Sequence, residues 1–324
     1  MDADSAMMTL LSGDNTDQYN AKIIESLDDA NDSDVISMIM VMKGCMIPVQ
    51  LYNDDVIDMC GTGGDQLGTF NISTAATFVA AAAGAHIAKH GNRSSSGGIG
   101  SADIFEMLGV QINNINPHAM LKGHNLCFLF AQRYHPAVRH VAGARRILSR
   151  RTIFNMLGPL CNPANVRYQL VGVSDYTMLE RIPRIMSRCG SIRVMSVISK
   201  NGLDELSSTS SSMICLYKDG HSTVFNMSVD DLGISESPLS DIIPDTKHES
   251  LQYFVGGISG NATDGIVHTT ALNAAAGMVV AGMVDTIPEG FDIAMDTIKS
   301  GRALHTLCEF VREFGDIAVL EGMT

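Results

Sequence analysis

The chain has 324 residues, of which 45% are hydrophobic, and its formal net charge is −13. This length allows one large domain or a large and a small domain, and an acidic chain without a basic tract is a poor candidate for binding nucleic acid. The seven scattered cysteines lack a CxxC pair, which favours free thiols in a reducing cytoplasm over a disulfide framework or a zinc site. No segment is typical of a signal peptide, a membrane span, a P-loop or a dinucleotide-binding fingerprint.

The first 52 residues have a helical pattern. Segments 17–28 and 32–43 are candidate amphipathic helices, and Gly44 and Pro48 end the second of them. We therefore expect a short pair of helices ahead of the first strand. This pair would form either a small helical subdomain or a contact within a dimer.

Residues 54–103 carry the most informative pattern in the chain. A short run of strand type at 56–59 is followed by three glycines within residues 61–64. Glycine permits positive φ angles and lets a ligand approach the backbone closely. Asn71 is a favourable N-terminal cap type, and the alanine-rich segment 75–83 suits a buried helix.

A second short strand, at 86–88, leads into the polar loop KHGNR at 89–93. The strands of a βαβ unit are parallel and joined by a right-handed crossover, so both loops lie at the carboxyl edge of the sheet, where α/β sheets bind ligands. The glycine loop and the helix N-terminus suit a phosphate, and the basic loop suits further anionic oxygens. Each loop alone has a structural alternative, but their common location favours a binding site.

The rest of the chain alternates between helical and strand patterns, which predicts an α/β fold. Expected helices cover residues 102–108, 117–124, 176–189, 264–284 and 291–314, and expected strands cover residues 110–112, 125–130, 168–173 and 192–198. A hairpin with strands at 213–217 and 223–227 would turn at Asp219-Gly220, and residues 234–250 are expected to form a loop.

Six arginines lie between residues 132 and 164 of this acidic chain. At helical spacing Arg139, Arg145 and Arg146 cannot all share one face. One interpretation is a solvated helix with salt bridges, which the spacing alone favours. The other is that at least one arginine points into a cleft and binds a substrate carboxylate bidentately.

Two adjacent acids, Asp204 and Glu205, follow the strand expected at 192–198. Adjacent acids in a loop are usually solvated and without a specific role. If this strand is parallel to the others, however, the two carboxylates face the phosphate loop. Carboxylates combined with phosphate oxygens and water are the usual ligands of Mg²⁺.

Five motifs, in order, resemble those of the anthranilate phosphoribosyltransferases, which belong to the nucleoside phosphorylase-like phosphoribosyltransferases. They are GTGGD (61–65), NIST (71–74), KHGNR (89–93), RTIFNMLGPLCNPA (151–164) and LDEL (203–206). The resemblance implies a small helical domain over 1–52, with 132–163 packing on it. It also implies a large α/β domain over 53–131 and 164–324, with a mainly parallel central sheet and C-terminal helices.

The same resemblance implies an activity. The enzyme would transfer the 5-phosphoribosyl group from phosphoribosyl pyrophosphate to the amine of anthranilate, the second step from chorismate to tryptophan. Two Mg²⁺ ions per active site, a cytoplasmic location and a homodimer are expected on the same basis. Small molecules would be its substrates, with no nucleic acid or membrane partner.

The resemblance assigns site residues position by position. The phosphoribosyl pyrophosphate site comprises Gly61, Gly64, Asp65, Thr69, Asn71, Ile72, Ser73, Thr74, Lys89, His90, Gly91, Asn92, Arg93, Ser94, Ser95, Ser96 and Ser101. Anthranilate would contact Gly61, His90, Asn92 and Arg145, with Tyr134, His135 and Pro159 as further candidates. Magnesium would be held by Ser73, Asp204 and Glu205, and no residue is assigned as a general acid or base.

The sequence departs from the family pattern in two places. The family's second loop usually continues after its serines with a lysine and a serine, whereas here the segment is Gly97-Gly98-Ile99-Gly100, so a positive charge near the diphosphate is missing. Only residues 44–53 separate the N-terminal helices from the first strand, where the family normally has another helix. Two alternatives remain: a pyrimidine nucleoside phosphorylase-like enzyme, and a repurposed non-catalytic paralogue.

Overall fold

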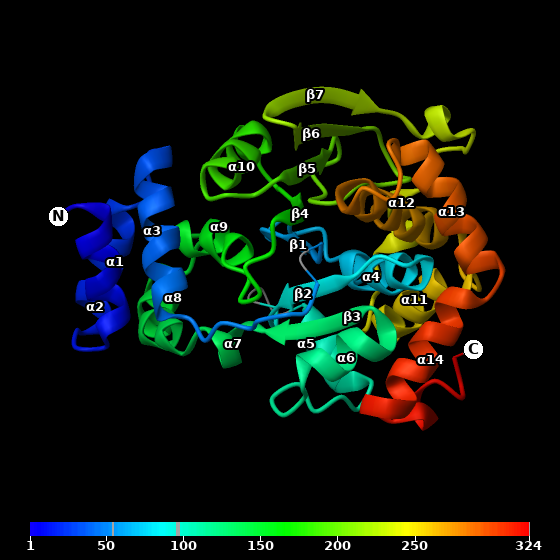
Figure 1. The fold of residues 1–324 in the computed structure, drawn as a ribbon, viewed down its shortest axis with the longest axis horizontal. Helices are drawn as coiled ribbons and strands as arrows, with labels where there is room; N and C mark the ends of the chain where they lie inside the picture. Colours follow the sequence, from blue (N-terminus) through cyan, green and yellow to red (C-terminus); the bar gives the residue numbers. More distant parts are fainter. Residues whose placement is uncertain (54, 95–97, 324) are drawn as a thin grey trace.

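The computed structural model describes residues 1–53, 55–94 and 98–323, which are organised around one seven-stranded sheet (Figure 1). Its strands are β1 (Ile57–Gly61), β2 (Ile87–Gly91), β3 (Leu126–Phe130), β4 (Tyr168–Gly172), β5 (Arg193–Ser199), β6 (Ser212–Lys218) and β7 (His221–Met227). Their order is β3-β2-β1-β4-β5-β6-β7, with β1 to β5 parallel and β6 and β7 antiparallel. The expected mainly parallel α/β sheet and the hairpin are therefore confirmed.

The helices cover both faces of this sheet (Figure 1). Those between the strands are α4 (Ile72–Ala83), α5 (Ser101–Met107), α6 (Pro117–His124), α7 (Ala131–Tyr134), α8 (Ala142–Leu148), α9 (Ile153–Leu160) and α10 (Tyr176–Arg188). The C-terminal helices are α11 (Lys247–Ser259), α12 (Asp264–Ala281), α13 (Ile287–Lys299) and α14 (Arg302–Phe314). Short 3₁₀ segments are η1 (Pro136–Val141), η2 (Val229–Leu232), η3 (Leu239–Ile242) and η4 (Ile317–Val319).

The N-terminal helices α1 (Ala3–Ser12), α2 (Asp17–Ser26) and α3 (Asp32–Cys45) lie on the left of Figure 1, opposite the C-terminal helices. Helix α2 packs against α8, α1 against η1 and α3 against α9. A later part of the chain thus returns to this group of helices. The sequence predicted only α2 and α3; α1 is an additional helix, in which the Asp2 side chain accepts a hydrogen bond of 2.8 Å from the Ser5 N–H.

The β1–α4–β2 unit forms as the sequence predicts. Helix α4 is buried along most of its length, and its small side chains allow close packing against α12, α11 and α14. Gly84, at φ +112°, ends the helix in the left-handed conformation that glycine adopts without strain. Because β1, β2 and β5 are parallel members of one sheet, the loops that follow them open at the same edge.

Three expectations about the secondary structure were wrong. Residues 110–112 form no strand; the Val110 N–H instead bonds the Phe105 carbonyl at 2.9 Å and closes the end of α5. The segment 234–250 is not entirely loop, because α11 begins at Lys247. The helix expected over 291–314 is two helices, which separate at Gly301 with φ +78°.

None of the helices in the described part of the chain combines the length and the apolar character needed to cross a membrane.

Candidate active site

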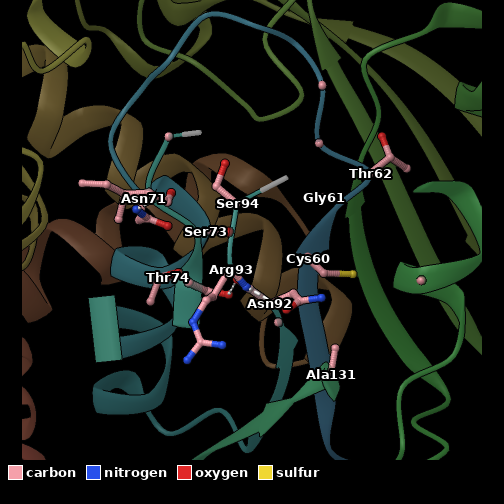
Figure 2. Close-up of a pocket in the computed structure, with 18 of the residues that line it drawn as sticks. Cys60, Gly61, Thr62, Asn71, Ser73, Thr74, Asn92, Arg93, Ser94 and Ala131 are labelled. Carbon is pink, nitrogen blue, oxygen red and sulfur yellow. Dashed lines mark hydrogen bonds between the residues drawn. The ribbon is translucent and has the colours of Figure 1, made fainter. Parts of the chain in front are cut away.

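A cavity of about 1340 Å³ opens at the carboxyl edge of the parallel strands. Its lining includes residues of the glycine loop after β1, the first turn of α4, the loop after β2 and the acid pair after β5. Figure 2 shows Asn71, Ser73 and Thr74 close to Asn92, Arg93 and Ser94, beside the ends of the strands. The three segments that were expected to meet are therefore brought together around one cavity.

The glycine loop is shaped for a ligand that contacts backbone. Gly63 and Gly64 have φ angles of +64° and +85°, and a Cβ atom on Gly64 would collide with Nη1 of Arg151. The Arg151 guanidinium in turn donates hydrogen bonds to the Gly63 carbonyl and to the Ser174 hydroxyl. Arg151 thus holds the loop from outside, and only glycine leaves room for it.

The first turn of α4 presents backbone donors that no side chain caps. Asn71 occupies the N-cap position, but its side chain makes no capping bond and instead donates to the Ile99 carbonyl at 3.1 Å. This bond ties the start of α4 to the loop after β2. The N–H groups at the start of α4 are left without a side-chain cap, which favours an anion at this position.

The acid pair lies deep in the cavity wall. Asp204 and Glu205 are 9% and 8% exposed, and Oδ2 of Asp204 accepts a hydrogen bond of 2.9 Å from the Gly63 N–H. Burial, with the nearby Asp65 carboxylate, raises the pKa of Asp204 to about 7. Burial, with the Asp204 charge, raises the pKa of Glu205 to about 8. Burial of two adjacent carboxylates costs free energy. Such a pair is typical of a site that a bound cation completes.

Close backbone approach makes this position of the acids possible. A Cβ atom on Gly172, the last residue of β4, would collide with the Asp204 carbonyl oxygen. Only a glycine therefore lets the segment after β5 cross the end of β4.

Lys89 is the buried cation of the site. Its ammonium group donates to the Met59 carbonyl at 2.6 Å and to the Ser73 hydroxyl at 3.1 Å. Burial lowers the pKa of Lys89, while the nearby Asp58 and Glu205 carboxylates act against that shift. The lysine therefore links the end of β1 to the first turn of α4 and offsets part of the acidic charge.

Two histidines form an uncharged part of the wall. The rings of His90 and His135 lie 5.1 Å apart, and the Nε2 atom of each is buried without a hydrogen-bond partner among the described residues. Burial lowers the pKa of His90 to about 3, with a smaller contribution from His135, so His90 is neutral at pH 7. These two nitrogens are therefore buried polar atoms without a hydrogen bond to the described residues.

Of the arginines discussed above, Arg139 and Arg145 line the cavity, and Arg146 does not. Arg145 is half-buried, which lowers its pKa, and it donates to the Asn155 side chain at 3.3 Å. Within the described residues it has no acidic partner. The structure therefore favours the interpretation that the spacing alone did not, namely an arginine available to an anionic ligand.

Comparisons with known proteins agree with this geometry. A family model described as "Glycosyl transferase family, a/b domain" matches residues 53–304. The anthranilate phosphoribosyltransferase of Nitrosopumilus maritimus (strain SCM1) is 44% identical over 320 residues, which are 97% of this chain and 92% of that protein. That of Petrotoga mobilis (strain DSM 10674 / SJ95) is 40% identical over 290 residues, covering 88% of this chain and 83% of that protein. The chain belongs to the anthranilate phosphoribosyltransferase family.

Solved structures of the family share the whole fold. The anthranilate phosphoribosyltransferase from Thermus thermophilus matches with a TM-score of 0.86 at 31% identity, covering 96% of this chain and 94% of that one. The Saccharomyces cerevisiae enzyme in complex with PRPP and Mg matches with a TM-score of 0.82 at 24% identity, covering 95% and 90%. The fold class expected from the family resemblance is thereby confirmed.

Most of the residues that the family resemblance assigned line the cavity. They are Gly61, Gly64, Asp65, Thr69, Asn71, Ile72, Ser73, Thr74, Lys89, His90, Gly91, Asn92, Arg93, Ser94, Ser101, His135, Arg145, Pro159, Asp204 and Glu205. Ser95 and Ser96 lie outside the described residues. Tyr134 is not part of the lining; it is buried in the core, where the Arg133 guanidinium lies 5.2 Å from its ring centroid.

Sequence reasoning missed the wall formed by the start of α11. Pro244, Asp245, Thr246, Lys247 and Ser250 line the cavity there. A signal was present: Thr246 with Glu249 three residues later is a capping-box pattern. The Glu249 N–H donates to the Thr246 hydroxyl at 3.1 Å, and the Asp245 N–H donates to the Glu249 carboxylate at 2.6 Å.

The donor atoms of the cavity fit the Mg²⁺ that the family resemblance implies. The described residues contain no group of three or more His, Cys, Asp or Glu arranged to hold a metal ion alone. The Asp204 and Glu205 carboxylates face the phosphate loop beside the Ser73 hydroxyl, and Mg²⁺ is usually bound by one or two carboxylates with substrate phosphates and water. The donor set therefore fits a magnesium ion that arrives together with a phosphate substrate.

Proposed function

We propose that this chain transfers the 5-phosphoribosyl group from phosphoribosyl pyrophosphate to anthranilate, as a glycosyltransferase of tryptophan biosynthesis. The products are N-(5-phosphoribosyl)anthranilate and pyrophosphate. The observation that carries the proposal is the meeting of a glycine loop, a basic loop and an acid pair around one cavity. The family to which the chain belongs supports the same activity.

The sugar-phosphate substrate is bound by backbone and by short polar side chains. The glycine loop and the uncapped N-terminus of α4 supply N–H donors for phosphate oxygens. The loop after β2, with Asn92, Arg93, Ser94 and Ser101, closes over the ribose and the diphosphate. Asp103 links Ser94 to Gly100 in this segment. Its carboxylate accepts hydrogen bonds from the Gly100 N–H at 2.7 Å and from the Ser94 N–H at 3.4 Å.

Asp204, Glu205 and Ser73 are proposed to hold Mg²⁺, which when bound neutralises charge on the pyrophosphate. We propose two ions per site, which agrees with the presence of two adjacent buried carboxylates. Lys89 orients Ser73 through a 3.1 Å hydrogen bond to its hydroxyl. It also places a positive charge next to the proposed metal site. The protein thus stabilises negative charge that develops on the leaving group.

Anthranilate is proposed to bind at the other end of the cavity. Its carboxylate would pair with the Arg145 guanidinium, and its ring and amine would lie beside Gly61, His90 and Asn92. His135 and Pro159 complete this wall. The pKa values of both histidines are lowered, so the positive charge for the carboxylate comes from Arg145. This charge favours anthranilate over an aromatic amine that has no carboxylate.

The reaction forms a bond from the anthranilate nitrogen to C1 of the ribose and breaks the bond from C1 to the pyrophosphate oxygen. An aromatic amine is neutral at pH 7, so its lone pair needs no base to attack, and its proton is lost after the bond has formed. Catalysis then rests on positioning and on electrostatic stabilisation, and no residue is assigned as a general acid or base.

The assembly and location of the protein are also proposals. We propose a homodimer formed through the N-terminal helices, where Met8 of α1 and Met40 of α3 are 59% and 60% exposed on helices that pack together. The helical domain would comprise residues 1–52 with 132–163, and the α/β domain residues 53–131 and 164–324. A cytoplasmic location agrees with seven free cysteines.

A fluorescence assay of anthranilate consumption tests the activity directly. Purified protein should consume anthranilate only when phosphoribosyl pyrophosphate and Mg²⁺ are both present. A parallel assay should detect no phosphorolysis of pyrimidine nucleosides with inorganic phosphate. Phosphorolysis without Mg²⁺ would favour the nucleoside phosphorylase, and inactivity in both assays would favour a non-catalytic paralogue.

A further inference from the structure

Lys247 is a cation of the cavity wall that has no partner among the described residues. It is the first residue of α11, it lines the cavity, and its exposed side chain makes no hydrogen bond or ion pair with any residue that the structure describes. None of the motifs that identify the family includes this residue. The family motifs therefore do not account for a lysine at this position.

The first turn of α11 is fixed next to the phosphate-binding segments. The Phe70 N–H donates to the Ile242 carbonyl at 3.1 Å, and the rings of Phe70 and Tyr253 lie 6.3 Å apart. The neighbouring residue Asn71 bonds the Ile99 carbonyl. One wall of the cavity thus combines the start of α4, the end of the loop after β2 and the start of α11.

Among its described residues, this wall has no other lysine or arginine. Residues 68–71 and 98–101 line it and contain no lysine or arginine. The remaining cavity cations are engaged or lie on other segments: Lys89 bonds Met59 and Ser73, and Arg93 pairs with Glu106 at 2.5 Å. Among the described residues, a phosphate group bound at this wall would find backbone N–H groups, the Asp245 carboxylate and one positive side chain, that of Lys247.

Local stability does not account for a lysine at this position. A positive side chain in the first turn of a 13-residue helix is unfavourable, because the helix dipole places partial positive charge there. The acidic residue of that turn, Glu249, is occupied by the Asp245 N–H and the Tyr253 hydroxyl. An anion bound beside the lysine would offset this unfavourable interaction with the helix dipole.

We propose that Lys247 binds a phosphate group of the phosphoribosyl substrate and supplies the charge that the Gly98-Ile99-Gly100 segment lacks. The inference rests on the proposed function and extends it to a residue outside the family motifs. The phosphate is either the 5-phosphate or the pyrophosphate of one substrate, and the two are distinguished by inhibition.

Steady-state kinetics of Lys247→Ala and Lys247→Arg test the proposal. The KM for phosphoribosyl pyrophosphate should rise about five- to tenfold in Lys247→Ala, with little change in the KM for anthranilate, and should stay near the native value in Lys247→Arg. The inhibition constant of either ribose 5-phosphate or pyrophosphate should rise by the same factor and so identify the group. Lys122→Ala, an exposed lysine of α6 outside the cavity lining, is the matched control and should change nothing.

A rescue variant separates charge from structure. Among the described residues, a Cβ atom on Gly98 would meet only Ser94 Oγ, at 3.6 Å, so the backbone at this position has room for the start of a side chain. Gly98→Lys combined with Lys247→Ala should recover most of the lost affinity, and the melting temperature of Lys247→Ala should not fall. An active native protein whose KM changes less than twofold in Lys247→Ala would overturn the inference, whereas an inactive native protein would overturn the proposed function instead.

Discussion

The Gly63 N–H donates a hydrogen bond of 2.9 Å to the Asp204 carboxylate, although 141 residues separate the two. The bond joins the glycine loop after β1 to the acid pair after β5. A glycine at position 172 also lets the Asp204 backbone pass close to β4, so the residue is positioned through its backbone as well as through its carboxylate. The groups proposed to bind phosphate and metal are therefore fixed relative to each other before a substrate arrives.

Removal of both carboxylates tests the proposed metal site. Asp204→Asn with Glu205→Gln keeps the shape and the hydrogen-bond acceptors but removes the charges that favour Mg²⁺. We expect Mg²⁺-dependent turnover to fall on the order of 10²-fold or more. The control is Asp230→Asn with Asp231→Asn, an exposed pair of adjacent acids outside the cavity, which should keep the native rate. A near-native rate in the first variant would remove the metal role.

The raised pKa values predict that the metal-free protein loses stability as pH rises. The pKa of Asp204 is raised from 3.8 to about 7 and that of Glu205 from 4.5 to about 8, so the folded state holds protons that the unfolded state has released. Unfolding free energy therefore falls with pH between about 4 and 8 and levels off above that range. Near the lower end of the window from pH 6.5 to 8, the raised pKa of Asp58, about 6, adds to this decline and the lowered pKa of His90 opposes it. The contribution of the acid pair is therefore isolated by comparison with a variant that lacks both carboxylates.

Thermal unfolding in the presence of a chelator measures this effect. The melting temperature of the native protein should decline from pH 6.5 to 8, while that of the Asp204→Asn/Glu205→Gln variant should stay more nearly constant. Equal slopes for the two proteins would show that the acid pair does not retain its protons in the folded state.

The centre of the fold was predictable from sequence because its signals are local. Glycine and alanine patterns define β1, α4 and β2, and the parallel pairing that follows from a βαβ crossover places their loops at one edge. The errors lie where a local pattern is weak or ambiguous. Residues 110–112 have strand composition but find no neighbouring strand, and the break before α14 depends on one glycine with a positive φ angle.

The site was predictable in its motifs and not in its surroundings. Loop spacing placed Asp204 and Glu205 at the correct sheet edge, but which arginine reaches the cavity depends on how η1 and α8 turn the chain. Lys247 was missed for a different reason. Its segment comes to the cavity through contacts with Phe70, which sequence spacing does not report.

Substitution of Arg145 tests the proposed anthranilate carboxylate site. Arg145→Ala should raise the KM for anthranilate about 10- to 100-fold, with a much smaller effect on the KM for phosphoribosyl pyrophosphate, because a charge-assisted hydrogen-bonded pair is lost. Arg146→Ala is the matched control, since the neighbouring arginine is exposed and does not line the cavity. An equal rise of both KM values in Arg145→Ala would indicate a structural role.

Substitution of Gly64 tests whether the glycine loop is shaped for phosphate. Gly64→Ala should cost about 1–2 kcal/mol of stability, because φ +85° is a left-handed conformation that glycine adopts without strain and alanine does not. Gly190→Ala, at φ +97° with nothing within 4 Å of its Cβ position, should cost a similar amount and is the control. Only Gly64→Ala also displaces Arg151 from the Gly63 carbonyl, so only this variant should raise the KM for phosphoribosyl pyrophosphate. Melting temperatures and KM values measured side by side separate the two effects, and a similar KM rise in both variants would contradict the role of the loop.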